Sequence, residues 1–317
     1  MLLIALLAWI GRHGTQGFAL SIFLGLALPQ FAAAARPLLA VTIFIFVMLT
    51  FARADEAQVK ALLRRPKPLF IACTWLIVAP ALLMTILLTL IGRTTLDAGL
   101  VLGLAVMAAA PPIMSAPAIA MVLGLEPTLL LTSVLITTTL APLLSPVIVE
   151  WVAGTSVPLD LSILVQRLVV LIGGAIAGAA LLRKIIGMQR IKANGSVLDG
   201  IGVLMYFLFA VAAMDGVMDA AIANPSKVAQ FLGFAFLMAA LGFASAWLAL
   251  RSMTGADRFV LGYATGQRNM GLIIAALGAA SPKTTFLFFA LAQFPIYLLP
   301  QIVKPLAKRF AQQGINK

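Results

Sequence analysis

The chain has 317 residues, of which 62% are hydrophobic and only 10% are charged. Soluble domains carry about 25% charged residues, and a soluble fold could not keep so much apolar side chain from water. The composition therefore excludes a soluble enzyme, a nucleic-acid-binding protein and a disordered chain. Because a bilayer-spanning helix needs about 20 apolar residues, the sequence predicts an all-α polytopic membrane protein with about ten transmembrane helices, embedded in a lipid bilayer.

Ten apolar segments follow one another along the chain, separated by short connections. The residues before Arg12 are also apolar, but a basic residue after such a run is the wrong charge order for a cleaved signal peptide. We expect that first segment to lie at the membrane surface or to be half inserted. The predicted spans are 15–34, 37–53, 68–91, 97–123, 127–152, 161–182, 197–216, 228–250, 258–281 and 284–307.

The net charge of +12 is explained by membrane topology. Of the 22 basic residues, sixteen fall in connections on one side of the membrane and five on the other, and Arg268 lies inside a span. Cytoplasmic loops are enriched in Lys and Arg, which places both termini in the cytoplasm and requires an even number of spans. We expect an integral protein of a bacterial inner (plasma) membrane. The five basic residues on the opposite side are Arg36, Arg93, Arg167, Lys227 and Lys283.

Two of the predicted spans cannot be ordinary helices. The fourth contains Pro111, Pro112 and Pro117, and each proline removes a backbone donor and clashes with the preceding turn. The ninth contains a polar run in mid-span that begins at Gly266 and ends at Gly271. Breaks of this kind persist at membrane depth only where protein or a wet cavity satisfies the freed backbone groups. We therefore expect both helices to be broken at a functional site.

The positions of the two interrupted spans predict the architecture. They are the fourth spans of two five-span halves, residues 1–155 and 156–317. An odd number of spans in each half gives the halves opposite orientations in the membrane. The sequence thus predicts two inverted five-helix repeats with helices 4 and 9 broken, the pattern typical of secondary transporters.

The two interrupted spans resemble those of the bile acid:sodium symporter family. The ninth-span run from Gly266 to Gly271 is similar to the family's Gly-x-Gln-Asn-x-Gly stretch, with Arg268 where glutamine is usual. The third span, from Leu69 to Pro80, also looks like the family's. The fourth and fifth spans match over Ala109-Ala110-Pro111, then Thr137-Thr138, then Ala141-Pro142-Leu143-Leu144-Ser145-Pro146.

This resemblance implies a fold in two bodies and a substrate class. Spans 1, 2, 6 and 7 would form a panel domain, and spans 3–5 and 8–10 a core domain in which the broken helices 4 and 9 cross near the substrate. Members of the family carry bile acids, other organic anions or sulfated compounds, usually with two sodium ions.

The family's sodium ligands are largely replaced in this chain. The resemblance places one ion at a Ser-Asn pair after the span-4 break and hydroxyls of span 5; these positions hold Ala116, Pro117, Leu130 and Val134. It places the second ion at a glutamate and a glutamine of span 9 and a glutamine of span 3; these hold Ala264, Arg268 and Trp75. We therefore expect the fold to carry over without the sodium coupling.

The presence of Arg268 in mid-span requires an explanation, because inserting an arginine there costs at least about 2.5–3.5 kcal/mol on insertion scales. Its planar guanidinium matches carboxylate, sulfate or phosphate, so it could bind an anionic substrate. It could instead serve the unpaired carbonyl groups at the end of a half-helix, where the family has sodium. A third alternative is an ion pair with a carboxylate of another span. The first two alternatives are compatible.

The other candidate site residues cluster at the same two breaks. Asn269 can both donate and accept hydrogen bonds, whereas hydroxyls in spans are more often packing groups or bond local carbonyls. The predicted substrate-binding residues are Arg268, Asn269, Gln267, Thr265, Ser115, Met114, Pro117 and Thr138, and the predicted helix breaks are Pro111, Pro112, Gly266 and Gly271.

Asp215 and Asp219 are four residues apart near the end of the seventh span and would share one helix face. Two acids at the membrane surface are the simple interpretation, and a proton-coupling site or a partner for Arg268 is the alternative.

The sequence favours a secondary transporter of a small organic anion over other classes. A catalytic pairing, a metal-ligand cluster and a phosphate-binding loop are all missing from the sequence, so we expect no enzyme, no metal and no cofactor. No obligate protein partner is indicated either. A sodium-coupled symporter with residual sites and a non-transporting receptor on the same scaffold remain the alternatives.

Overall fold

The computed structural model describes residues 2–13, 18–64, 66–154 and 160–315. Within these ranges the regular elements are all helices. Seven helical segments there are long and apolar enough to cross a membrane: Pro29–Arg53, Pro66–Ile91, Thr128–Ala153, Leu161–Ile186, Gly195–Ala223, Pro225–Ala249 and Lys283–Ala307. The chain is an all-α polytopic membrane protein, as its composition predicts. The number of ten spans and the inverted repeat stay predictions.

The chain divides into two compact units, each built from two stretches of sequence. Unit 1 comprises Met1–Ala54 and Arg167–Ala229, and unit 2 comprises Asp55–Gln166 and Gln230–Lys317. Two of the three sequence boundaries fall within helices, α10 (Leu161–Leu168) and α15 (Pro225–Ala249). Each unit therefore contains parts of both sequence halves.

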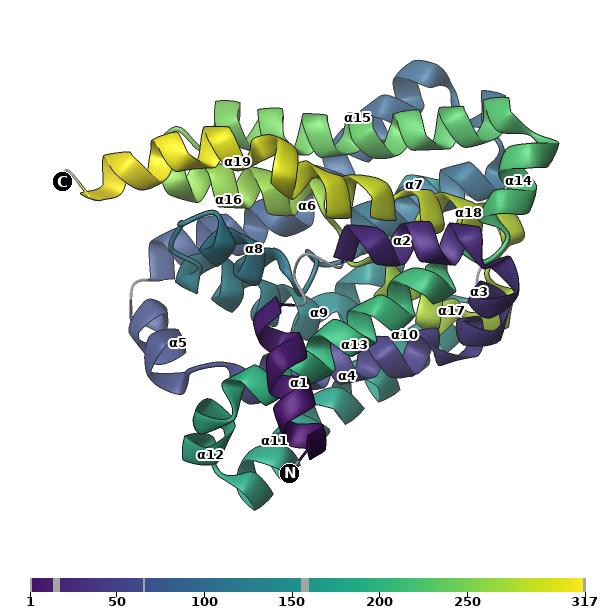
Figure 1. Ribbon diagram of the computed structural model, residues 1–317. Coiled ribbons are helices and arrows are strands. Elements are labelled where there is room, and N and C mark those ends of the chain that lie inside the picture. The colour runs from purple at the N-terminus through teal and green to yellow at the C-terminus, as the bar shows by residue number, and fades with distance from the viewer. Residues whose placement is uncertain (1, 14–17, 65, 155–159, 316–317) are drawn as a thin grey trace. The chain divides into compact units, whose positions relative to one another are not determined.

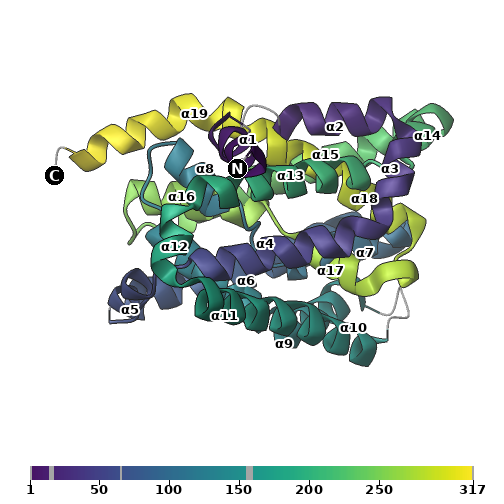
Figure 2. The ribbon, with the colours of Figure 1, turned by 60° about the horizontal axis from the view of Figure 1, so that its bottom comes forward.

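Unit 1 is a helical body with an aromatic centre. The Phe46 ring lies 4.0 Å from the Tyr206 ring and 6.2 Å from that of Phe209, measured between centroids. Figure 2 shows two of its long helices, α4 and α11, side by side. Its helices are α1 (Leu2–His13), α2 (Phe18–Ala27), α3 (Pro29–Ala35), α4 (Leu39–Arg53), α11 (Gly174–Ile186), α12 (Met188–Ala193), α13 (Gly195–Ala213) and α14 (Val217–Ala223), with a π-helical turn at Val169–Gly173.

The first apolar segment is a helix docked on another helix. α1 packs along α13 (Figure 1), and glycines permit the close approach. A Cβ atom on Gly11 would lie 2.1 Å from the backbone oxygen of Ser196, and one on Gly200 would lie 1.9 Å from that of Leu7. The sequence predicts that this segment lies at the membrane surface or is half inserted, and it does not predict the contact between α1 and α13.

The predicted span at 15–34, whose residues 15–17 lie outside the described residues, is wrong as one continuous helix. α2 ends at Ala27 and α3 begins at Pro29, because a proline disfavours helical geometry in the residue before it and is well suited to the first turn of a new helix. A 310 turn at Arg36–Leu38 then joins α3 to α4. The long apolar segment of this region is therefore Pro29–Arg53 rather than 37–53.

Unit 2 is built around α7 (Ala98–Ala109), whose residues from Gly99 to Ala109 are all buried. Gly103 lets the Phe288 side chain of α18 lie directly against this helix, where a Cβ atom would be 2.6 Å from the ring. The Phe288 ring in turn packs edge-on against Phe231 of α15, 6.0 Å away between centroids. The other helices of unit 2 are α5 (Glu56–Leu63), α6 (Pro66–Ile91), α8 (Ala116–Val122), α9 (Thr128–Ala153), α16 (Gly255–Gly266), α17 (Met270–Leu277), α18 (Lys283–Leu291) and α19 (Gln293–Ile315).

Helix α10 begins at an aspartate cap. Asp160 accepts hydrogen bonds from the Ser162 hydroxyl at 2.7 Å and from the backbone N–H groups of Ile163 and Ser162 at 3.1 and 3.0 Å. These bonds lower the pKa of the exposed Asp160 carboxyl below its usual value, because they favour its charged form. The carboxylate thus satisfies amide groups that the first helical turn leaves free.

Candidate functional site

Two helices of unit 2 are interrupted. α7 ends at Ala109 and α8 begins at Ala116, and the residues between them, which include Pro111 and Pro112, are not helical. α16 ends at Gly266 and α17 begins at Met270. Both interruptions are buried except for partial exposure at Ser115 and Asn269.

The two interruptions pair with each other through their backbones. The amide of Ile113 donates to the carbonyl oxygen of Gln267 at 3.0 Å, and the amide of Asn269 donates to that of Pro111 at 2.8 Å. Pro112 and Arg268 lie opposite each other between these bonds, as in one rung of an antiparallel sheet. Pro112 has no amide N–H, and at this position the pairing requires none from it. The flanking backbone groups of the two breaks satisfy one another, as buried backbone requires.

Side chains and local turns complete the pairing at the helix ends. The Ser145 hydroxyl of α9 donates to the carbonyl oxygen of Ala109, the last residue of α7, at 2.8 Å. At the end of α16, the amide of Gln267 still donates to the carbonyl oxygen of Tyr263 at 3.1 Å, as in a continuing helix. The last carbonyl groups of a helix have no helical donor. At the crossing, neighbouring groups supply the donors.

Arg268 lies at the centre of this crossing and is 3% exposed. Its Nη2 donates to the carbonyl oxygen of Leu76 in α6 at 2.8 Å, and its Nη1 donates to that of Ala264 in α16 at 3.4 Å. In an α-helix the carbonyl of Leu76 would accept from the amide of residue 80, but Pro80, inside α6, has none. Arg268 thus supplies a donor to the carbonyl that Pro80 leaves free, and ties α6 to the end of α16.

The guanidinium of Arg268 has no carboxylate partner among the described residues. Its Nε, the Oε1 of Gln267 and the Oγ1 of Thr138 are buried without a hydrogen-bond partner. A cavity of about 10 Å³, close to the volume that one water molecule needs, lies between Arg268, Thr137 and Ser145. Buried polar groups rarely go unpaired, so the crossing holds hydrogen-bonding capacity that the described protein groups do not use.

Thr265 is occupied by a neighbouring helix. It accepts a hydrogen bond from the indole Nε1 of Trp75 at 3.0 Å and donates to the carbonyl oxygen of Leu261 at 2.6 Å. Thr265 therefore joins α6 to α16 through Trp75.

Gly266 lies where two backbones meet. A Cβ atom there would be 2.6 Å from the Cα of Ala239, and a Cβ on Gly242 would be 2.6 Å from the amide nitrogen of Gly266. The end of α16 thus packs directly on α15. The glycine is needed for this approach and not for an unusual backbone conformation, since its φ is not positive.

The remaining predicted residues occupy both sides of the crossing. Met114 is 8% exposed and precedes the half-buried Ser115, while Pro117 is buried in the first turn of α8. Asn269 precedes α17 and is half-buried, and Gly271 is buried in the first turn of that helix. Ser115 and Asn269 are the predicted polar residues of the crossing that keep partial exposure.

Asp215 and Asp219 lie in unit 1 and do not share one continuous helix. α13 ends at Ala213, Gly216 adopts a left-handed conformation with φ of 74°, and α14 begins after it. Asp215, in this turn, forms an ion pair with Arg36 at 2.6 Å, and Asp219 is exposed on α14. The spacing of four residues therefore does not place the two acids on one helix face, because the helix turns between them.

Sequence reasoning missed three contacts of the crossing: the Leu76 carbonyl, Ser145 and Gly242. Pro80 in mid-span is the signal that a carbonyl four residues earlier lacks its donor. The sequence carries no comparable signal that Ser145 would bond the end of α7, since a hydroxyl in a helix usually bonds the backbone carbonyl of the residue four positions earlier in the same helix.

The chain matches no protein-family model and no curated protein.

Proposed function

We propose that this chain is a secondary transporter of a small organic anion, with Arg268 at the crossing of two broken helices as a fixed cation in place of a bound ion. The observation that carries the proposal is the buried Arg268 guanidinium, which has no carboxylate partner among the described residues and donates to carbonyl oxygens of α6 and α16. An arginine at membrane depth is a functional-site residue by default.

The hydrogen bonds of Arg268 support its role as a replacement for a cation. The carbonyl oxygens of Leu76 and Ala264 are ligands of the kind that a hard cation takes in proteins. Two side chains at positions that the family resemblance assigns to sodium, Leu130 and Val134, are fully buried and carry no oxygen. We propose that transport is therefore independent of sodium.

The unpaired polar atoms support an anionic, hydrogen-bonding substrate. A guanidinium presents five donors in a plane that matches carboxylates, sulfates and phosphates, and the Nε of Arg268 is unused. The half-buried Asn269 and Ser115 would contact the substrate first. Because Arg268 is 3% exposed, substrate must reach it through a change of conformation, which alternating access provides.

The architecture of the chain supports the same class of protein. Paired discontinuous helices are the binding elements of many secondary transporters, and this chain pairs two of them. We propose that units 1 and 2 are the two moving bodies, that the halves 1–155 and 156–317 are inverted repeats, and that both termini are cytoplasmic in a bacterial inner membrane, as the distribution of basic residues indicates.

Transport in proteoliposomes tests the proposal. Thermal-shift screening of carboxylates, sulfonates and phosphates on the purified protein identifies a stabilising anion, since a ligand stabilises by mass action. Counterflow of that anion, labelled, is then measured in sodium and in choline. We expect equal counterflow in both, abolished by Arg268→Gln and partly kept by Arg268→Lys.

Each other result contradicts part of the proposal. A steep dependence on sodium would indicate a sodium-coupled symporter. Binding without counterflow would indicate a receptor on a transporter scaffold. Stabilisation by cations or neutral solutes alone would refute the anionic substrate.

A further inference from the structure

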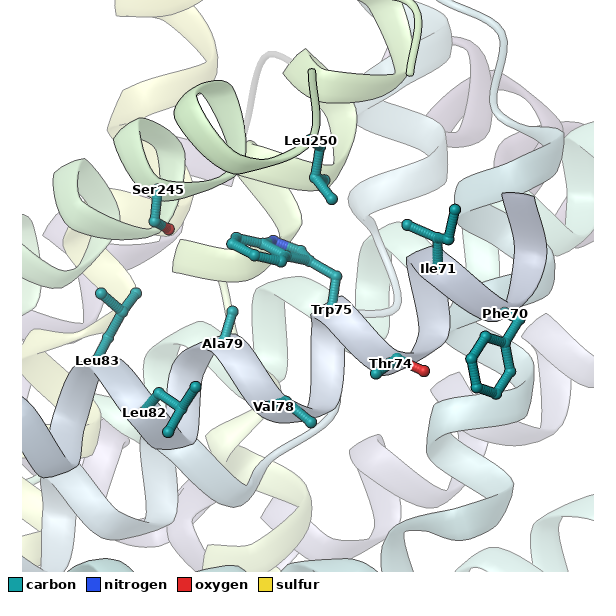
Figure 3. Close-up of a pocket in the computed structure, with 10 residues that line it drawn as sticks. All are labelled: Phe70, Ile71, Thr74, Trp75, Val78, Ala79, Leu82, Leu83, Ser245 and Leu250. Carbon is teal, nitrogen blue, oxygen red and sulfur yellow. The ribbon is translucent and has the colours of Figure 1, made fainter. Parts of the chain in front are cut away.

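Unit 2 contains a second feature, an open apolar groove between α6 and α15. Its volume is about 410 Å³, within the range of about 300–1,000 Å³ typical of small-molecule sites. Figure 3 shows its floor and walls, with Trp75 between Ile71 and Ala79 of α6, and Ser245 and Leu250 contributed from the side of α15. The groove therefore follows two antiparallel helices, each long enough to cross a membrane.

The lining selects an apolar occupant. The indole nitrogen of Trp75 is bonded to Thr265, and the hydroxyl of Ser245 donates to the carbonyl oxygen of Gly242 in its own helix at 3.0 Å. These two polar groups are thus already paired, a third polar side chain, Thr74, lies at the exposed rim of the groove, and the other lining residues are apolar, mainly aliphatic. Val78 is 42% exposed, so the groove opens to the surface of unit 2.

One end of the groove is basic. Lys67 lies three and four residues before Phe70 and Ile71, on the same stripe of α6, since residues at these spacings are neighbours on a helix surface. Arg251 directly follows Leu250, at the end of α15, and its Nε donates to the carbonyl oxygen of Leu248. Lys67 and Arg251 are both exposed.

The positions of these two cations match a lipid headgroup. α6 begins at Pro66 and α15 ends at Ala249, so Lys67 and Arg251 lie at the membrane-surface ends of their helices. The nearest described acid beyond Arg251 in the sequence, Asp257, is bonded to Thr254. Basic residues between transmembrane helices at a membrane surface bind anionic headgroups.

We propose that this groove binds one anionic phospholipid, with an acyl chain along Trp75 and Val78 and the phosphate between Lys67 and Arg251. The proposal does not rest on the transport function, since its evidence is the groove and the two cations, although Trp75 of the groove also bonds Thr265 at the crossing. Its chemistry requires both parts of the ligand: the groove takes the chain, and the cations select the charge.

Lipid binding to the purified full-length protein tests the proposal. Native mass spectrometry compares phosphatidylglycerol with phosphatidylcholine of the same acyl chains, and glycerol phosphate competes as the soluble headgroup. We expect phosphatidylglycerol to bind preferentially and glycerol phosphate not to displace it. Because each cation near a membrane surface contributes about 1 kcal/mol, the double variant Lys67→Gln/Arg251→Gln should bind phosphatidylglycerol about 30-fold more weakly.

Matched variants separate the effect of the groove on lipid binding from the effects of net charge and of added side-chain volume. Lys184→Gln/Arg190→Gln removes two exposed cations of unit 1 and should leave binding unchanged. Ser245→Phe fills the groove and should weaken binding of both lipids, whereas Ala244→Phe adds the same ring at an exposed neighbouring position that does not line the groove. Equal binding of the two lipids, wild-type binding by Lys67→Gln/Arg251→Gln, or equal effects of the two phenylalanine variants would overturn the proposal.

Discussion

The hydrogen bond between Arg268 and the carbonyl of Leu76 permits a quantitative test. Arg268→Met removes the 2.8 Å bond and leaves a buried carbonyl without a donor, which costs about 1–3 kcal/mol. The same substitution removes a buried charge and recovers about 2.5–3.5 kcal/mol on insertion scales. The two effects oppose each other, so the sign of the net change is not fixed and the stability of this single variant does not test the role of the bond.

A double-mutant cycle with Pro80→Ala isolates that role. Alanine at position 80 has an amide that can donate to the carbonyl of Leu76 within α6, so Arg268 is no longer needed there. We expect Arg268→Met to be less destabilising, or more stabilising, in the Pro80→Ala background by about 1–2 kcal/mol, since an orphaned carbonyl costs about 1–3 kcal/mol and interhelical bonds in membranes measure about 0.6–1.7 kcal/mol.

The assay is the free energy of unfolding of the four proteins by denaturant in mixed micelles. Pro146→Ala is the matched control, because Pro146 is also a buried proline inside a transmembrane helix, α9, whereas the side-chain bonds of Arg268 go to Leu76 and Ala264. A coupling between Arg268→Met and Pro80→Ala below about 0.5 kcal/mol, the usual scatter of independent sites, would refute the role. So would an equal coupling to Pro146→Ala.

Three further predictions concern single positions. Gly266→Ala should destabilise the protein by about 1–3 kcal/mol through overpacking against α15, while Gly233→Ala, whose added Cβ meets no atom within 4 Å, should not; equal unfolding free energies would contradict this. Asp160 has a lowered pKa in the folded state, so its stabilisation is present above its unfolded pKa of about 3.9 and is lost as pH falls through the lower folded value. The stability difference between wild type and Asp160→Asn should therefore be present at pH 6 and shrink towards pH 3, and a difference that grows on acidification would oppose the cap. Asp215→Asn and Asp219→Asn should leave the pH dependence of anion counterflow unchanged, because one acid is held in an ion pair and the other is exposed; a shifted profile in either variant would instead support proton coupling.

Part of the crossing is readable from local chemistry alone. Pro111 and Pro112 exclude a continuous helix because of their missing donors and fixed geometry, and a charged residue in an apolar run marks Arg268 as unusual. The partners of these groups are not readable in this way. Arg268 bonds a carbonyl 192 positions away, and Trp75 bonds Thr265 across 190 positions. No spacing rule within one segment contains such contacts.

The spacing rule failed where its assumption failed. Asp215 and Asp219 would share a face only on a continuous helix, but Gly216 adopts a positive φ and the chain turns between them. The predicted span at 15–34 has the same fault, since hydropathy averages over Leu28 and Pro29 and does not register a local change of direction. In both cases a pattern along the sequence implies a continuous helix, and the backbone does not form one there.

By itself the sequence determined that this protein resides in a membrane and that two of its helical segments are chemically unsuited to run unbroken. Hydropathy and proline chemistry act locally, so they can be read along one segment. Only the tertiary structure decided which backbone groups of the two breaks bond to each other, that Arg268 serves a carbonyl freed by Pro80, and that Ser145 bonds the end of α7. These outcomes depend on which distant segments pack together, because a buried donor or acceptor must find its partner in space and not along the chain.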